Sequence, residues 1–271
     1  MSGAVAIVGN LSVDRVAGAV PRPGGGVYYG ALGARRLGID ARVAARCAER
    51  DREVALAPLE RIGLPVSFEP AAETTRFSFH YEGERRVMEV DAIGDSWRPG
   101  DITGWAAPAL DGASWVHVGA LLRSDFAADT LRAAAANGRK LLVDAQGLLR
   151  RAETGPLRRD ADVDPSLLAS VQVLKLSEAE AKLLAGGLAP ASLRALGVPE
   201  VVLTLGSEGS VVITAEDEER VPAERVPGVD PTGAGDIYAI GYLAARAGGA
   251  SPGEAARQAG VLVTALLSER T

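Results

Sequence analysis

Short apolar runs alternate with longer helical patterns along most of the chain. The helical patterns cover residues 27–37, 53–62, 127–136 and 178–184. The apolar runs have the length of buried strands and occupy residues 4–8, 41–45, 115–118, 140–143, 171–174 and 201–204. Strands that alternate with helices are typical of a mainly parallel sheet covered by helices on both faces. The pattern therefore predicts an α/β fold, a three-layer sandwich, in a single domain of residues 1–271.

Two stretches interrupt this rhythm because their polar and apolar residues alternate around a turn. Residues 74–81 and 85–90 flank the turn at 82–84, which is a hairpin pattern and not a crossover unit. Residues 211–214 and 220–221 flank an acidic turn, which we expect to be a solvated tip of a second hairpin.

The last two helical patterns carry clear boundary signals. Residues 235–247 are apolar on nearly every side, so this helix should be buried. The next helix should begin at Ser251, because Ser251, Pro252 and Glu254 form a capping box with proline at the first helical position.

Composition narrows the class of protein. The chain has 271 residues, of which 47% are hydrophobic, and can therefore bury a sizeable core. Its net charge of −6, without a basic block, argues against nucleic acid or an anionic membrane as a partner. A single cysteine, Cys47, excludes an internal disulfide, and neither a signal peptide nor a membrane-spanning run is evident. We therefore expect a cytoplasmic protein.

Few residues are available for metal or nucleophilic chemistry of the common kinds. The two histidines, His80 and His117, lie in separate strand patterns, where we expect structural roles. With one cysteine, a zinc cluster or Cys/His catalysis has little to build on. The Gly-Lys-Ser/Thr sequence of a Walker-type phosphate loop is also absent.

The most informative local sequence is Asp-Pro-Thr-Gly-Ala-Gly-Asp at residues 230–236, directly before the apolar helix. A glycine turn that opens into a helix presents unpaired backbone N–H groups, and the helix dipole adds about half a positive charge there. Glycines also let the backbone approach a phosphate closely. Asp236 could accept a proton from an attacking hydroxyl, whereas merely complementing the dipole would contribute about 0.3–1 kcal/mol. The combination favours phosphoryl transfer.

This turn resembles the C-terminal signature of the ribokinase-like (PfkB) carbohydrate kinase family. Further stretches resemble the family in the same order along the chain. They are residues 8–14 (VGNLSVD), residues 23–25 with Ala31 and 37–38, residues 175–180 (KLSEAE), and residues 204–209 (TLGSEG). The ordered set is much more specific than any one of these stretches alone.

The resemblance implies a role for each matching residue. Asp236 would be the catalytic base, in an anion hole formed by Gly233, Ala234 and Gly235. Substrate hydroxyls would be held by Asp14, which can accept two hydrogen bonds from a vicinal diol, together with Ser12, Gly25 and Tyr29. The nucleotide would contact Ser177, Thr204, Gly206 and Gly209. Glu180 would organise magnesium through water, and Asp230 with Thr232 would form half of a monovalent cation site suited to potassium.

The resemblance also implies a small β lid over the substrate, formed by about residues 11–22 and 66–91. Such a lid would keep water from the transferring phosphoryl group. Exposed lid edges can pair between subunits, so we include a homodimer through the lid among the expectations.

Several residues also permit other interpretations of their roles. Ser177 stands where the family usually has asparagine, and Ser177 with Glu180 also reads as a capping box. Tyr29 stands where ribose- and fructose-type members commonly have asparagine, so an aromatic ring would pack on a sugar or polyol face. The sequence given stops at Thr271, before segments that often floor the adenine pocket in the family. Arg150, beyond a polar strand end at 144–147, could steady phosphates but is expected at the surface.

The sequence therefore predicts an ATP- and magnesium-dependent kinase acting on a hydroxyl of a sugar or polyol, with an inositol-like substrate included. A nucleoside kinase is the alternative, because Tyr28 and Tyr29 could wall a base. A non-catalytic ligand-binding relative is the alternative from another class. A dinucleotide-binding oxidoreductase is disfavoured because the glycines at 24–26 follow no predicted strand.

Overall fold

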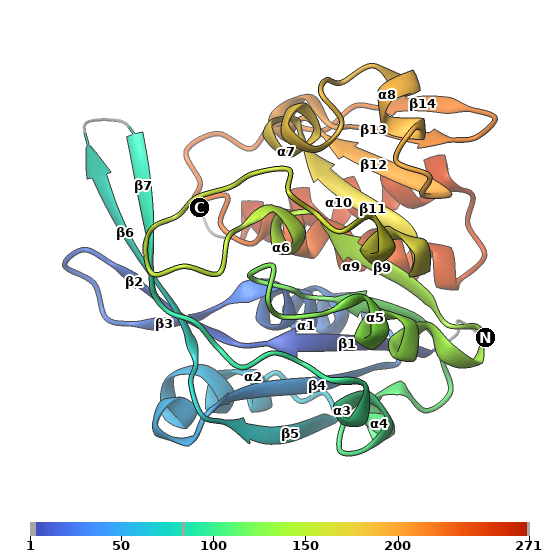
Figure 1. Ribbon diagram of the computed structural model, residues 1–271. Helices are drawn as coiled ribbons and strands as arrows, with labels where there is room; N and C mark the ends of the chain where they lie inside the picture. Colours follow the sequence, from blue (N-terminus) through green and yellow to red (C-terminus); the bar gives the residue numbers. More distant parts are fainter. Residues whose placement is uncertain (1–3, 83–84, 270–271) are drawn as a thin grey trace.

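This computed structural model describes residues 4–82 and 85–269. A nine-stranded sheet runs through its centre (Figure 1). In spatial order its strands are β14 (Glu218–Val221), β13 (Ser210–Thr214), β12 (Glu200–Thr204), β11 (Val171–Ser177), β9 (Lys140–Asp144), β8 (Ala113–Val118), β1 (Ala4–Asn10), β4 (Ala41–Ala48) and β5 (Val66–Ala71).

The sheet is mainly parallel, as the alternating pattern predicts. The seven strands from β12 to β5 pair in parallel, whereas β13 and β14 form the antiparallel hairpin expected near the end of the chain. The acidic tip of that hairpin is exposed at Glu216 and Asp217. Parallel register places Lys175 of β11 directly beside Asp144 of β9. The α/β prediction is confirmed.

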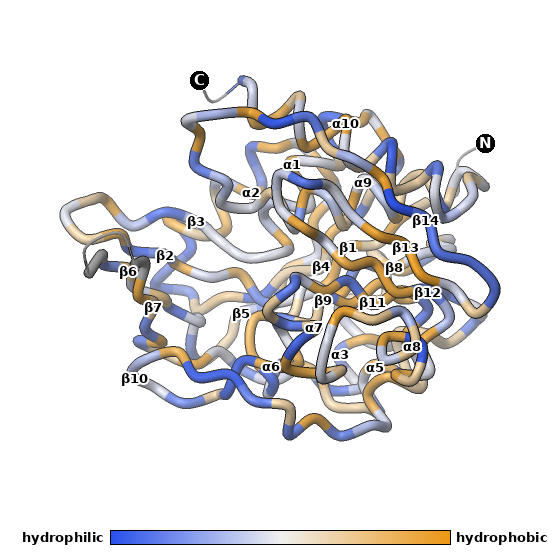
Figure 2. The backbone as a smooth tube through the Cα atoms, turned by 90° about the horizontal axis from the view of Figure 1, so that it is seen from above, coloured by the Kyte–Doolittle hydropathy of each residue, from blue (hydrophilic) through white to orange (hydrophobic). Residues whose placement is uncertain are grey.

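Helices cover both faces of this sheet. One face carries α1 (Gly25–Leu37), α2 (Ala57–Glu60), α9 (Ala234–Ala247) and α10 (Pro252–Ser268). The other carries α3 (Pro99–Thr103), α4 (Ala107–Leu110), α5 (Ala128–Ala135), α7 (Glu178–Leu184) and α8 (Pro190–Arg194), while α6 (Gln146–Leu149) directly follows β9. Two apolar cores therefore lie on opposite sides of one sheet. The central strands are largely hydrophobic, and hydrophilic segments lie mostly in the surrounding loops (Figure 2).

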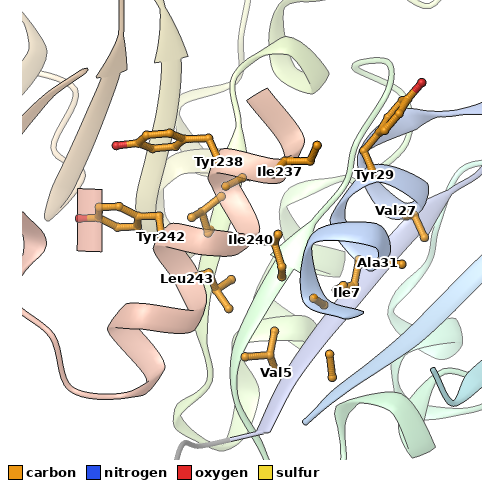
Figure 3. Close-up of a cluster of buried hydrophobic side chains, with 14 of the residues drawn as sticks. Val5, Ile7, Val27, Tyr29, Ala31, Ile237, Tyr238, Ile240, Tyr242 and Leu243 are labelled. Atoms are coloured by element: carbon orange, nitrogen blue, oxygen red, sulfur yellow. The ribbon is translucent and has the colours of Figure 1, made fainter. Parts of the chain in front are cut away.

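The helix α9 is buried along most of its length, as its apolar composition predicts. Residues 237–245 are all buried, and α9 packs against α1 through side chains such as Ile240 (Figure 3). A Cβ at Gly33 of α1 would lie 2.5 Å from Ile240 Cγ2, so the two helices meet closely only because Gly33 has no side chain. The capping box at Ser251 also forms as expected. This packing fixes the start of α9 above the sheet.

A second, five-stranded sheet stands beside the first (Figure 1). Its strands, in order, are β10 (Gly155–Pro156), β7 (Arg85–Ala92), β6 (Thr75–Glu82), β2 (Ser12–Val16) and β3 (Arg22–Gly24). We call it the small sheet. The hairpin predicted at 74–90 is its β6–β7 pair, and its turn at 83–84 lies outside the described residues.

One local prediction was wrong, and the structure adds detail to two others. Residues 66–71, assigned to the lid, pair in parallel with β4 and form the edge of the large sheet. The helix predicted at 53–62 forms over residues 52–60, with a π-helical turn over Arg52–Leu56 that continues into α2, where Pro58 lies in the first α-helical turn. The glycines at 24–26 follow no strand of the kind that a dinucleotide-binding crossover requires, because Gly24 ends the antiparallel β3 of the small sheet, and that prediction is confirmed. No helix in the described part of the chain is long and apolar enough to cross a membrane.

Candidate active site

The expected site residues gather at the carboxyl ends of the parallel strands. β1 lies between β4 and β8, and successive connections leave it in opposite directions, which makes a topological switch point. Open α/β sheets bind ligands at such a point. The chain leaving β1 turns into β2 of the small sheet, and the start of α9 lies close by. Both sheets thus contribute to one site.

The glycine turn takes the conformation that its sequence predicts. Gly233 has φ +80°, in the left-handed region, and a Cβ there would lie 2.3 Å from the Tyr29 ring. The N–H of Ala234 donates to Pro231 O at 2.9 Å. In residues 4–82 and 85–269, the N–H groups of Gly235 and Asp236 have no hydrogen-bond partner. Two free donors at the positive end of a 14-residue helix have the geometry that favours binding of an anion.

Asp236 lies half-buried in the first turn of α9. Burial and the neighbouring Asp144 carboxylate raise the pKa of Asp236 to about 7, against the opposing effects of Lys175 and Arg150. Gln146 Nε2 approaches Asp236 Oδ1 at 3.4 Å. A carboxyl group with a pKa near neutrality can accept and release a proton at physiological pH.

A buried ion pair supports the glycine turn from the sheet. Lys175 Nζ lies 2.7 Å from Asp144 Oδ2, and both side chains are almost fully buried. Burial lowers the pKa of Lys175, but the carboxylates of Asp144, Glu180 and Asp236 together outweigh burial and the pKa is raised overall, so the lysine stays charged. A Cβ placed on Gly235 would lie 3.3 Å from Lys175 Nζ. The ammonium group is therefore next to the backbone of the predicted anion hole.

A pocket of about 240 Å³ opens on one side of the turn. We call it the polar pocket because two carboxylates, Asp14 and Asp236, line it. The small sheet, the first turns of α1, the segments that follow β8 and β9, and the start of α9 contribute to its wall. The lining residues are Ser12, Asp14, Gly25, Tyr29, Phe77, Phe79, Met88, Leu121, Gln146, Arg150, Pro231, Thr232, Gly233 and Asp236.

Asp14 is held in place by its neighbours. Ser12 Oγ donates to Asp14 Oδ1 at 2.8 Å, and only 5% of Asp14 is exposed. A Cβ at Gly24 would lie 2.3 Å from Asp14 Oδ2, so glycine is required beside this carboxylate. Gly25 has φ +87°, where a Cβ would lie 2.8 Å from Leu121 Cδ2. The glycine segment before α1 thus makes room for a fixed carboxylate.

Phe77, Phe79 and Met88 of the small sheet line the same pocket. The Arg150 guanidinium lies over the Phe77 ring, 5.7 Å from its centre. The expectation that Arg150 is a surface residue was wrong, because α6 turns the chain back so that Arg150 is half-buried against the pocket.

A second pocket, of about 410 Å³, lies on the other side of the turn. We call it the apolar pocket. Its only charged lining residues among those described are the exposed Glu224 and Arg225. The remaining lining residues include Thr204, Gly206, Gly209, Tyr238, Gly260, Val263 and Leu267, together with Ala234 and Gly235. Gly209 has φ +101°, and a Cβ there would lie 2.0 Å from Val221 O, so this turn also requires glycine.

Three of the expected residues, Ser177, Glu180 and Asp230, line neither pocket. Ser177 and Glu180 form a complete capping box at the start of α7, with Ser177 N donating to Glu180 Oε2 at 2.8 Å. Asp230 Oδ1 accepts from the Thr232 N–H and hydroxyl, at 3.0 and 2.6 Å, and Arg22 lies 3.5 Å from Asp230 Oδ2. Among the residues that the structure describes, no group of three acidic, histidine or cysteine side chains forms a ready metal site.

His117, on β8, is fully buried under α1, and a Cβ at Gly30 would lie 3.2 Å from its Nδ1. Burial and the charge of Lys175 lower the pKa of His117 to about 3, so the imidazole stays neutral. His80 lies on β6 of the small sheet. A larger hollow, about 1040 Å³, lies at the opposite ends of β8 and β9 and contains none of the expected site residues.

The family profile of pfkB family carbohydrate kinases matches residues 11–268, and the chain belongs to this family. An aminoimidazole riboside kinase of Salmonella typhimurium is 49% identical over 51 residues, which cover 19% of this chain and 16% of that protein. The chain therefore matches only a small part of this curated relative.

Solved structures confirm the ribokinase-like fold. One is a pyrophosphate-dependent kinase of the ribokinase family in complex with a pyrophosphate analogue and myo-inositol. It has a TM-score of 0.83 at 22% identity, with 97% of this chain and 94% of that chain covered. An Arabidopsis thaliana ribokinase with ribose and ATP has a TM-score of 0.74 at 17% identity, with coverages of 99% and 93%.

Sequence reasoning missed part of the site. The position of Lys175 within the family-like stretch at 175–180 was the only signal for it, and its pairing with Asp144 required the strand register. Gln146 and Arg150 lay in a recognised polar strand end, but nothing in the sequence directed Arg150 inward. The lining by Phe77, Phe79 and Met88 depends on how the small sheet sits beside the large one.

Proposed function

We propose that this protein transfers the γ-phosphoryl group of ATP to a hydroxyl group of a sugar or polyol. One observation carries the proposal. The turn at 233–236 separates the two pockets, with Gly233 and Asp236 lining the polar pocket and Ala234 and Gly235 lining the apolar pocket. A base therefore faces one ligand, while the free N–H groups of the turn lie between that ligand and a second one.

In this mechanism Asp236 takes the proton of the acceptor hydroxyl as its oxygen attacks the γ-phosphorus. The bond from the γ-phosphorus to the bridging oxygen breaks, and ADP leaves. The N–H groups of Gly235 and Asp236 and the ammonium of Lys175 lie where negative charge develops, so they stabilise it without rearrangement. Phosphoryl transfer depends mainly on such positioning and electrostatics.

The polar pocket is suited to a small polyhydroxylated ring. Asp14 accepts hydrogen bonds from adjacent hydroxyls, and Ser12, Gly25 and Tyr29 complete that wall. A volume of about 240 Å³ is below the roughly 300–1,000 Å³ typical of pockets for drug-sized ligands. That size supports a single sugar or inositol ring over a nucleoside. The myo-inositol named for the structural neighbour fits the same expectation.

The apolar pocket is assigned to the adenosine of ATP, with Thr204, Gly206 and Gly209 near its phosphates and Ser177 at the adjacent strand end. Mg²⁺ binds proteins through one or two carboxylates together with substrate phosphates and water, so a cluster of three acids is not required. Glu180 would hold the ion through water, and the bound Mg²⁺ would neutralise negative charge on the phosphates. Asp230 and Thr232 are proposed as half of a potassium site.

A panel assay tests the function. Purified protein with Mg²⁺ is offered ATP or pyrophosphate and, separately, myo-inositol, ribose, fructose and adenosine, and phosphorylated product is measured by ³¹P NMR. We expect ATP with a monocyclic polyol or sugar to give the highest rate. Product from adenosine alone would favour the nucleoside kinase, and product from pyrophosphate alone would overturn the donor assignment. No product together with no calorimetric binding of Mg²⁺-ATP would support a non-catalytic ligand-binding protein.

Two further features complete the proposal. The small sheet acts as a lid, because Phe77, Phe79 and Met88 reach the polar pocket from β6 and β7. Pairing of two chains through the edge of the small sheet remains a proposal, which the molecular mass in solution would test.

A further inference from the structure

The positively charged side chain of Arg150 has no role in the mechanism proposed above. It follows the short helix α6, and its N–H donates to Gln146 O at 3.1 Å. Gln146 and Arg150 therefore come from one helical turn, and both line the polar pocket. Gln146 contacts Asp236 directly, at 3.4 Å. Arg150 is thus positioned by the same turn that reaches the proposed base.

The guanidinium group of Arg150 has no carboxylate partner in the described part of the chain. Its Nε is buried and makes no hydrogen bond there. Two other partly buried arginines do have carboxylate partners: Arg46 lies 2.9 Å from Asp101 and Arg246 lies 2.6 Å from Glu200. A buried charge without a partner is costly, and arginine does not release its proton in proteins. We therefore expect the Arg150 guanidinium to bind an anion from outside the protein, since no described side chain provides one.

The surroundings direct this charge toward the pocket. One side of the guanidinium is occupied by the Phe77 ring. Burial and the nearby Arg159 lower the pKa of Arg150. The carboxylates of Glu180, Asp236 and Asp144 act in the opposite direction and raise that pKa. Among the described residues Arg150 and Asp236 form no ion pair, although Asp236 raises the pKa of Arg150 and Arg150 lowers that of Asp236. Arg150 is the only cationic residue among those described that line the polar pocket.

We propose that Arg150 binds an oxyanion inside the polar pocket, opposite the N–H groups of the glycine turn. The proposal deepens the function above and rests on it for the identity of the anion. A neutral sugar or polyol gives Arg150 no negative charge, so the oxyanion comes from one of two sources. It is either the phosphoryl group in transfer or an acidic group on the acceptor, and the planar guanidinium can bind either one with two hydrogen bonds.

Binding of inorganic phosphate tests the site without any turnover. The variants are Arg150→Met, which keeps much of the stem, Arg150→Lys, which keeps the charge, and the exposed control Arg158→Ala. Thermal unfolding is followed in phosphate and in chloride of equal ionic strength. We expect phosphate to stabilise the wild type and Arg158→Ala, and its affinity to fall about 10- to 100-fold in Arg150→Met, with partial recovery in Arg150→Lys. An unchanged phosphate effect in Arg150→Met overturns the proposal, even if that variant is less stable without ligand.

Kinetics then distinguish the two sources. If Arg150 holds the transferring phosphoryl group, Arg150→Met lowers kcat for every acceptor, neutral ones included, with little change in the acceptor KM. If it holds an acidic group of the acceptor, only sugar phosphates or sugar acids lose affinity, and neutral polyols react as before. Equal kinetics of Arg150→Met and wild type with both kinds of acceptor overturn the proposal. A wild type that binds phosphate through Arg150 but phosphorylates nothing would instead refute the kinase function alone.

Discussion

The two pockets on either side of the α9 turn differ sharply in what lines them. The polar pocket holds two carboxylates and a guanidinium within about 240 Å³, whereas the apolar pocket is larger, about 410 Å³, and is lined mainly by small and apolar residues. Chemistry that moves charge needs fixed charges, and recognition of a flat apolar ring needs shape. Substitutions in the polar pocket should therefore affect turnover, while those in the apolar pocket should affect donor binding.

The strongest test of this division is Asp236→Asn. Loss of a general base lowers turnover by about 10²- to 10⁴-fold, and the amide keeps the shape of the side chain, so folding should be intact. The measurement is kcat with the best acceptor from the panel, beside the exposed control Asp217→Asn. Turnover close to that of the wild type would remove Asp236 from the mechanism.

The support of the turn is tested by Lys175→Met. This change leaves Asp144 buried without its partner, so the free energy of unfolding should fall by about 3–5 kcal/mol. Urea unfolding measures that loss. In the double variant Lys175→Met/Asp144→Leu most of the stability should return, because neither charge is buried alone, but turnover should stay low. Full turnover in the double variant would show that Lys175 serves only the fold.

Turnover should fall at low pH, since Asp236 must lose its proton to act as a base. With a pKa of about 7, kcat/KM should fall about tenfold per pH unit below neutrality. Stability changes in the opposite direction. The pKa of Asp236 in the folded protein lies above the ordinary 3.8, so the folded state holds a proton that the unfolded state releases. Protonated Asp236 therefore stabilises the folded state at low pH, and this stabilisation is lost as pH rises through about 7. Asp236→Asn should abolish this loss, and a rate independent of pH between 5 and about 7 would contradict the assigned base.

The smallest expected effect belongs to the apolar pocket. Gly260 of α10 lines it, and a Cβ at this position meets no other atom within 4 Å. Gly260→Leu should therefore fold normally, partly fill the pocket and raise the KM for ATP roughly tenfold, about 1.4 kcal/mol, with little change in kcat. Pyrophosphate, which has no base to place there, should be used as before if it is a donor at all. An unchanged KM for ATP would place the nucleotide elsewhere.

Local sequence determined much of the fold. The alternation of apolar runs and helical patterns predicted most strands and helices, and the glycines at 233 and 235 predicted the turn before α9. These features are readable because periodicity and backbone conformation depend on neighbouring residues. Gly233 has positive φ and lies against Tyr29, so its requirement is visible as a glycine in the sequence itself.

Tertiary structure decided the rest of the site. The strand β5 could belong to either sheet by its own pattern, and only pairing with β4 assigned it to the large one. The Lys175–Asp144 pair exists because two strands 31 positions apart in sequence lie in one register. Arg150 points into the polar pocket because α6 turns the chain back and the small sheet covers it, and the contact with Phe77 of the small sheet is not encoded near Arg150 in the chain. Charges in a pocket depend on which distant elements meet there, and the folded core fixes that arrangement.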